Sequence, residues 1–74
     1  MKEQITSIIK RLTGYDEIDD ETDLIEEDIL DSLAFLELIS ELEETFDIEI
    51  QPTQVPSDTW RRIDSIVEMV AGLK

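Results

Sequence analysis

The sequence predicts an all-α fold: a small four-helix bundle of three main helices and one short helix, with a long loop between the first and second helices. Two observations predict it. Apolar residues recur at the helical period in three stretches, residues 2–12, 32–46 and 61–71. The one segment that alternates like a strand, residues 47–51, has no second strand to pair with. At 74 residues, we expect a single domain over residues 1–74.

The first helix is expected over residues 2–12. Lys10 and Arg11 in its last turn suit the negative end of the helix dipole, and Gly14 is a typical C-terminal stop. Its apolar residues form one stripe that should face the core: Ile5, Ile8, Ile9 and Leu12.

Residues 15–31 form the long connection, and ten of the sixteen residues from 16 to 31 are acids. Four apolar residues are expected to fix it to the core: Leu24, Ile25, Ile29 and Leu30. An EF-hand loop needs Gly at its sixth position and Glu at its twelfth. Counted from Asp19, these positions hold Leu24 and Leu30. We therefore predict no specific metal ligands, and only loose divalent-cation binding stays open.

The second helix is expected over residues 32–46. Its core stripe is predicted to comprise Leu36, Ile39, Leu42 and Phe46, with Leu38 at the margin. Three acids on the opposite side form what we call the acidic ridge: Glu37, Glu41 and Glu44. Leu33 and Phe35 are predicted to lie outside the buried stripe, near Ser32.

After the second helix, Ile48 and Ile50 are expected to lie in an extended connection that buries both. Pro52 and Pro56 then leave room for about one short helical turn before Trp60, which we expect to be a packing residue. The last helix is predicted over residues 61–71 and is ended by Gly72. Its stripe is Ile63, Ile66, Val67 and Val70.

Charge is the most informative bulk property, with twenty acids, six bases and a net charge of −14. Of the twenty acids, only Glu3, Asp64 and Glu68 lie outside residues 12–60, so that span holds seventeen acids. All six bases lie outside it. Such a surface repels nucleic acid and speeds encounter with basic partners. Crowded carboxylates should also raise one another's pKa.

The composition argues against catalysis by the chain alone. It contains no Cys and no His, so a thiol nucleophile and the commonest general base are both missing. We predict that the protein is not an enzyme. There is no apolar stretch long enough to span a bilayer and no signal-like segment, so we expect a cytoplasmic protein. We also expect a monomer.

Ser32 stands where the second helix begins. Asp31 is a good N-cap, because its carboxylate can accept from the N–H of Leu33 or Ala34. Ser32 then lies in the first turn, where free N–H groups and the helix dipole favour an anion such as a phosphate ester. From these residues alone, a simple helix cap and a covalent attachment site both stay open.

Taken together, these segments resemble the acyl carrier protein family, the phosphopantetheine-binding carrier proteins. The likeness rests on Asp31-Ser32-Leu33 at the start of the second helix, on the residues 34–39 that follow, and on Thr22-Asp23-Leu24 in the loop. The run from 43 to 50 is similar to the family's exit from that helix. One difference is that many members have Gly shortly before the Asp-Ser pair, where this chain has residues 28–30 without Gly.

The resemblance implies that Ser32 carries 4′-phosphopantetheine, transferred from coenzyme A by a separate phosphopantetheinyl transferase. The arm would hold acyl or aminoacyl groups as thioesters, as in fatty acid biosynthesis. Asp31 would be the helix cap beside it. Further implied partners are a loading ligase and acyl-processing enzymes with basic patches. The docking residues would be Leu33, Glu37, Glu41 and Glu44.

Two alternatives to a fatty-acyl carrier remain. The Leu30-Asp31-Ser32 form and Trp60 are more similar to D-alanyl carrier proteins, which serve teichoic acid D-alanylation. A different class, an acidic helical interaction module without a prosthetic group, would explain the charge and leave Ser32 as a cap only.

Overall fold

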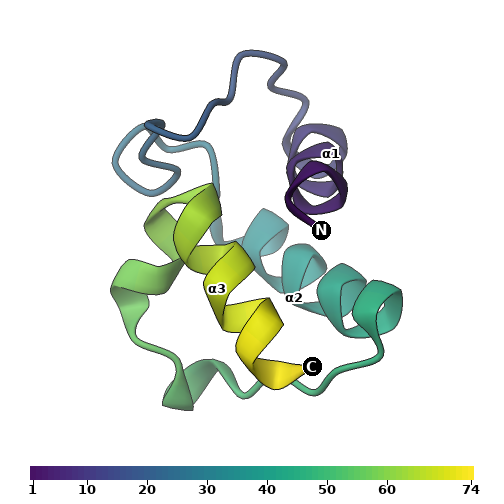
Figure 1. Cartoon of the computed structure of the whole chain (residues 1–74). Coiled ribbons are helices and arrows are strands. Elements are labelled where there is room, and N and C mark those ends of the chain that lie inside the picture. The colour runs from purple at the N-terminus through teal and green to yellow at the C-terminus, as the bar shows by residue number, and fades with distance from the viewer.

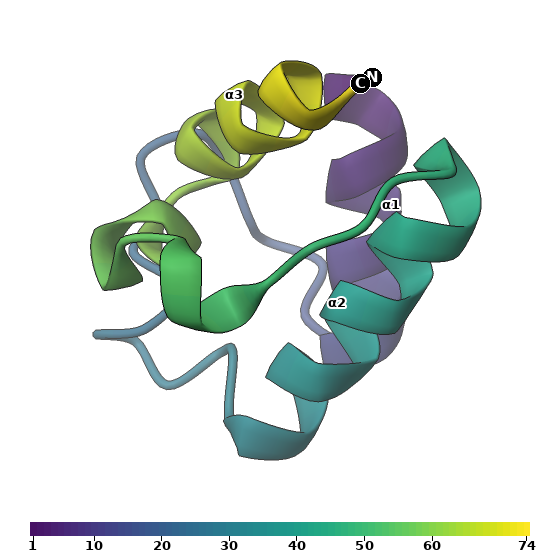
Figure 2. The same cartoon turned by 90° about the horizontal axis from the view of Figure 1, so that it is seen from below.

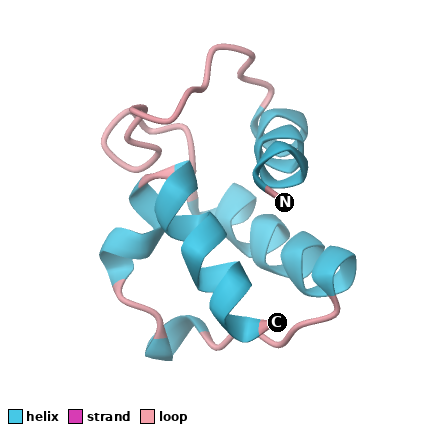
Figure 3. Cartoon of the chain, viewed as in Figure 1, coloured by secondary structure: helices cyan, strands magenta, loops and turns pink.

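The computed structural model describes residues 1–74. Helices are its only regular secondary structure, and there is no strand (Figures 1 and 3). Three α-helices, α1 (Lys2–Thr13), α2 (Ser32–Phe46) and α3 (Ile63–Leu73), are joined by loops and two 3₁₀ segments, η1 (Pro52–Gln54) and η2 (Ser57–Arg61). The all-α class is confirmed. In place of one short fourth helix, the structure has these two 3₁₀ segments. The two prolines explain this, because each lacks an N–H and restricts the residue before it.

The helices meet around one core. α1 packs against both α2 and α3, and η2 packs against α3 (Figures 1 and 2). The connection over residues 14–31 arches from the end of α1 to the start of α2 (Figure 1). The path of this loop therefore decides where α2 begins.

The ends of α1 and α2 follow from their capping residues. α1 ends at Gly14, whose φ of 77° is left-handed and whose N–H donates to the carbonyl of Lys10. It is one residue longer than predicted, since the hydroxyl of Thr13 donates to the carbonyl of Ile9 at 2.7 Å. α2 has the predicted bounds and ends at Asp47, which also adopts a left-handed φ of 53°.

The bounds predicted for the last helix were wrong by two residues at each end. Arg61 belongs to η2, and Arg62 is extended with φ −132° and ψ 149°, so α3 begins only at Ile63. Gly72 does not end the helix, which continues to Leu73. A glycine costs about 1 kcal/mol in a helix interior, but here it lies in the last turn.

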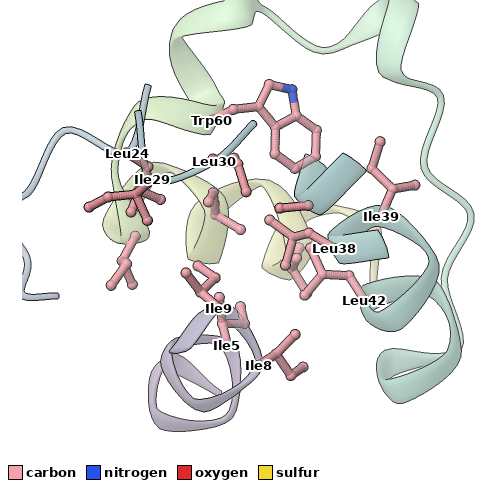
Figure 4. Packing of buried hydrophobic residues seen from close by; sticks show 14 of the residues in the cluster. Ile5, Ile8, Ile9, Leu24, Ile29, Leu30, Leu38, Ile39, Leu42 and Trp60 are labelled. Atoms are coloured by element: carbon pink, nitrogen blue, oxygen red, sulfur yellow. The ribbon is translucent and has the colours of Figure 1, made fainter. Parts of the chain in front are cut away.

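The core consists of apolar side chains only, and several of them come from the long loop (Figure 4). Leu24, Ile29 and Leu30 are buried as predicted. Ile25 is not, with 40% of its surface exposed, and the loop buries Ile18 instead. The buried set is Ile5, Ile8, Ile9, Ile18, Leu24, Ile29, Leu30, Ala34, Leu38, Ile39, Leu42, Phe46, Ile50, Trp60, Ile63, Ile66 and Val70.

The buried face of α2 differs from the prediction. Leu38, expected at the margin, is fully buried, whereas Leu36, expected in the core, is 61% exposed. Ala34 is also buried, and Phe35 packs against the core. The centre of the buried face therefore lies away from Leu36. On one side α2 packs against α1, and on the other side its Phe35 ring contacts Trp60.

Leu24 fixes the loop in three ways. Its side chain is fully buried, and its N–H donates to the carbonyl of Arg61 at 2.7 Å. Its own carbonyl accepts from the N–H groups of Ile29 and Leu30, at 3.1 and 2.9 Å. Next to it, the Arg61 guanidinium donates to the carboxylate of Asp23 at 2.9 Å. The loop is therefore tied to η2 by backbone and side chain together.

Two carboxylates of the loop, those of Asp19 and Asp23, have lowered pKa values, whereas the crowding of acids predicted raised ones. The pKa of Asp23 is lowered, first by the N–H of Glu26 and further by the Arg61 guanidinium. The pKa of Asp19 is lowered by the N–H of Glu21 and the hydroxyl of Thr22. Donors within each turn outweigh the like charges around them, so the prediction was wrong for these two acids.

We expect Leu24→Ala to lower the free energy of unfolding by about 2–5 kcal/mol, because it opens a cavity under the loop. The neighbouring Ile25→Ala should cost about 1 kcal/mol or less, since Ile25 is already exposed. Urea unfolding followed by circular dichroism measures both. Should Leu24→Ala fail to fold, Leu24→Val gives a smaller loss to compare. Equal losses at the two positions would contradict this account of the loop.

The lowered pKa of Asp23 predicts a pH-dependent contribution to stability. Its folded pKa lies below the ordinary 3.8, so the unfolded state takes up protons first as pH falls. The stability that Asp23 provides should be complete above about pH 5 and be lost as pH drops through the folded pKa. Wild type should therefore be more stable than Asp23→Asn at neutral pH, and the gap should close in acid. A gap that stays constant in urea titrations down to about pH 2.5 would refute this.

Candidate functional site

Ser32 is the first residue of α2, and it is exposed. As the sequence predicts, Asp31 caps the helix: its carboxylate accepts from the N–H of Ala34 at 2.8 Å. The carbonyl of Asp31 accepts from the N–H of Phe35, also at 2.8 Å. The N–H groups of Ser32 and Leu33 are left as free donors at the positive end of the helix dipole. An anion on Ser32 would meet both.

A groove with a volume of about 320 Å³ opens beside this hydroxyl, and we call it the serine groove. It lies between the end of the loop, the first turn of α2, and η2. Phe35 and Trp60 stand edge to face in it, with ring centroids 4.9 Å apart and planes at 88°. Its lining residues are Ile25, Leu30, Asp31, Ser32, Phe35, Ser57, Trp60 and Arg61.

Trp60 gives this groove a rigid wall. Its side chain is only 4% exposed, and its ring reaches into the core near Leu30 and Ile39 (Figure 4). Leu30 is buried beneath the same groove. The apolar wall beside Ser32 is therefore continuous with the core of the protein, and a ligand that touches it does not require the core to open.

The solvent side of α2 carries a stripe that we call the α2 outer face: Leu33, Leu36, Glu37, Ser40 and Glu44. All five side chains are exposed, Leu33 and Leu36 by 67% and 61%. The spacing of three and four residues places them on one side of the helix. The face is apolar next to Ser32 and acidic toward the C-terminal end of α2. Leu36 was not predicted to be part of it.

The acidic ridge does gather on one surface, but its three carboxylates are not equivalent. Glu37, Glu41 and Glu44 line a shallow groove of about 440 Å³ with Arg11 of α1. Glu41 is half-buried there and forms an ion pair with Arg11, with 3.0 Å between Nη2 and the carboxylate oxygen. Its charge is therefore largely offset within the chain. Glu37 and Glu44 remain exposed and without an ion pair.

Other parts of the surface offer no comparable chemistry. The largest hollow, about 720 Å³, lies between the 3₁₀ segments and α3, and none of the predicted site residues lines it. Nowhere do three or more carboxylates converge in a way that could hold a metal ion. None of the helices has both the length and the apolar character that crossing a membrane requires.

The arrangement at Ser32 can bear a phosphate ester. The chain contains no His, and one oxygen of the Asp31 carboxylate is engaged by the helix cap. The free N–H groups and the groove fit a long substituent joined through a phosphodiester. Arg61, which lines the same groove, was not among the site residues predicted from the sequence. The sequence does single this residue out, because Arg61 is the first base after residues 12–60, a span that contains no Lys or Arg.

Comparison with known proteins agrees with this geometry. The family model described as a phosphopantetheine attachment site matches residues 3–70. A D-alanyl carrier protein of Lactococcus lactis subsp. cremoris (strain MG1363) is 43% identical over 72 residues, which cover 95% of this chain and 91% of that protein. The D-alanyl carrier protein of Listeria monocytogenes serotype 4a (strain HCC23) is 31% identical over 75 residues, covering 99% and 96%.

Proposed function

Because the chain belongs to the phosphopantetheine attachment-site family, we propose that its single domain, residues 1–74, is a carrier protein whose arm is joined to Ser32 Oγ. The observation that carries this proposal is the exposed hydroxyl in the first turn of α2, with two free N–H groups and a groove beside it. The cofactor of the family is covalently attached 4′-phosphopantetheine. Its thiol supplies the thioester-forming group that a chain without Cys lacks.

The chain's own residues would hold the phosphodiester rather than perform chemistry. The N–H groups of Ser32 and Leu33 would face its oxygens, and Asp31 would keep the first turn of α2 in place. Transfer from coenzyme A would form a P–O bond at Ser32 Oγ and break a P–O bond of the coenzyme's pyrophosphate, with adenosine 3′,5′-bisphosphate as the leaving group. The hydroxyl proton would pass to a base supplied by the phosphopantetheinyl transferase.

We infer that the cargo is a D-alanyl group, loaded by a ligase for use in teichoic acid D-alanylation. The relatives with 43% identity along nearly the whole chain are named D-alanyl carrier proteins. The fatty-acyl cargo expected first from the sequence has no specific support from these relatives. The structure fits a small cargo, because Trp60 fills the space between α2 and η2 and each of the five hollows is open to solvent.

The α2 outer face is the surface that we propose for docking, together with Glu41. Leu33 and Leu36 would enter an apolar depression of the partner, while Glu37 and Glu44 meet its basic rim. Glu41 would contribute less than the other two acids of the ridge, since Arg11 already pairs with it. The alternative of an interaction module without a prosthetic group loses its basis, because the matching family is defined by the attachment site.

We expect Ser32→Ala to lose modification completely while keeping its helical circular dichroism, since Asp31 still caps α2. Wild type and variant are incubated with coenzyme A and a promiscuous transferase, then weighed intact. Ser57→Ala is the matched control, because Ser57 lines the same groove but does not begin α2. It should be modified like wild type. A wild type that gains no mass, or a Ser32→Ala variant that gains it, would disprove the attachment site.

Charge reversal on α2 should slow docking without unfolding the protein. We expect Glu37→Lys and Glu44→Lys each to slow modification and cargo loading about tenfold at low ionic strength, because they remove electrostatic attraction during encounter. High salt should shrink the difference. Glu68→Lys on α3 makes the same charge change at an exposed position away from α2 and serves as control. Equal losses at Glu68 would show that net charge, rather than this face, governs association.

A further inference from the structure

We propose that the serine groove is the resting seat of the phosphopantetheine arm and that Arg61 is the cation that contacts its phosphodiester. The inference rests on the proposed attachment to Ser32 and adds a positioning role for a residue of η2. It starts from the composition of the groove. Among the eight residues that line it, Arg61 is the one base.

The position of the phosphate is set by covalent geometry. Its phosphorus would be one bond from Ser32 Oγ, so it must lie at the edge of the groove whatever the rest of the arm does. The carboxylate of Asp31 is next to it, and residues 12–60 contain no base that could offset the two charges. Beyond the free N–H groups of Ser32 and Leu33, a cation that offsets these charges must come from a segment distant in sequence, and Arg61 lines the same groove.

Arg61 is held firmly and still has donors to offer. Its backbone carbonyl accepts from Leu24, its Nη1 donates to Asp23 at 2.9 Å, and its Nε lies 3.3 Å from the carboxylate of Asp58. A guanidinium has five N–H donors. Two are engaged by these carboxylates, so three remain, including both on Nη2. The side chain is 42% exposed, which leaves these donors open to a ligand.

The groove also explains the exposed side chain of Ile25. The neighbouring loop residues Leu24, Ile29 and Leu30 are buried. Ile25 is 40% exposed and lines the groove together with Phe35 and Trp60. An arm with apolar methyl and methylene groups would cover this surface once its phosphate is held at Arg61. The guanidinium and the apolar side chains that share the groove match the phosphate of the arm and the methyl-bearing carbon that follows it.

The test compares apo and holo forms of four proteins: wild type, Arg61→Met, Arg62→Met and Asp23→Asn. Arg62 is the charge-matched control, since it is exposed, makes no ion pair and does not line the groove. Intact mass first establishes modification of each protein. Emission from Trp60, the only tryptophan of the chain, and the ³¹P resonance of the phosphodiester then report where the arm lies.

We expect modification to change Trp60 emission in wild type, and Arg61→Met to reduce that change and shift the ³¹P resonance. The ratio of docked to free arm should fall about two- to fivefold, as for an ion pair open to water, and should also fall with salt. Arg62→Met should behave like wild type. Asp23→Asn should keep docking, because it removes the ion pair yet its amide oxygen can still accept from Nη1 of Arg61 and keep the guanidinium in place.

Each contrary outcome has a distinct meaning. If Asp23→Asn loses docking as fully as Arg61→Met, Arg61 acts only by fixing the loop, and the proposed phosphodiester contact is wrong. If wild type is modified but neither signal changes, the arm does not rest in the groove, while Ser32 remains the attachment site. If wild type is not modified at all, the proposed function is overturned and this inference falls with it.

Discussion

The burial of Leu24 is the constraint on which the rest of the structure depends. One residue places its side chain in the core, donates its N–H to Arg61 and accepts two N–H groups from Ile29 and Leu30. A loop of eighteen residues with ten acids would otherwise have little reason to fold against the bundle. With Leu24 fixed, the chain arrives at Asp31 in the extended conformation that an N-cap requires. The position of Ser32 follows from that cap.

The few bases of the chain are used where they join segments that are distant in sequence. Lys2 pairs with Asp20 of the loop and Asp64 of α3. Arg11 joins α1 to Glu41 of α2, and Arg61 joins η2 to Asp23. Each pair is partly open to water and contributes modestly to stability. Their shared effect is on the surface charge, since they offset acids of the loop and the inner edge of α2 and leave Glu37 and Glu44 unpaired.

This distribution gives a carrier protein two separate surfaces around one hydroxyl. On one side of Ser32, the α2 outer face offers exposed leucines and free carboxylates to a partner. On the other side, the serine groove offers aromatic walls and a guanidinium to an arm. If both proposals hold, a partner on the first surface would not have to displace an arm lying in the second. Under the proposed function, the protein would contribute the Ser32 hydroxyl together with its position and charge, and the transferase would contribute the base.

The sequence by itself determined the helical class, the bounds of α2, the cap at Asp31 and the position of Ser32 in the first turn. These depend on local physics: apolar period, capping side chains and the free N–H groups of a first turn. It also placed Glu37, Glu41 and Glu44 on one surface, since helical spacing fixes neighbours along one element.

Only the tertiary structure decided which residues of an element face the core. Leu38 is buried and Leu36 is exposed, contrary to the prediction. The contacts of α2 with α1 and Trp60 decide which of its residues face the core, and its own apolar pattern does not. Ile18 replaces Ile25 in the core because the loop turns at residues 19–28, where left-handed Asp28 and local side-chain caps set its path. The contact of Arg61 with Asp23 joins residues thirty-eight positions apart, a distance at which sequence spacing carries no information about which side chains meet.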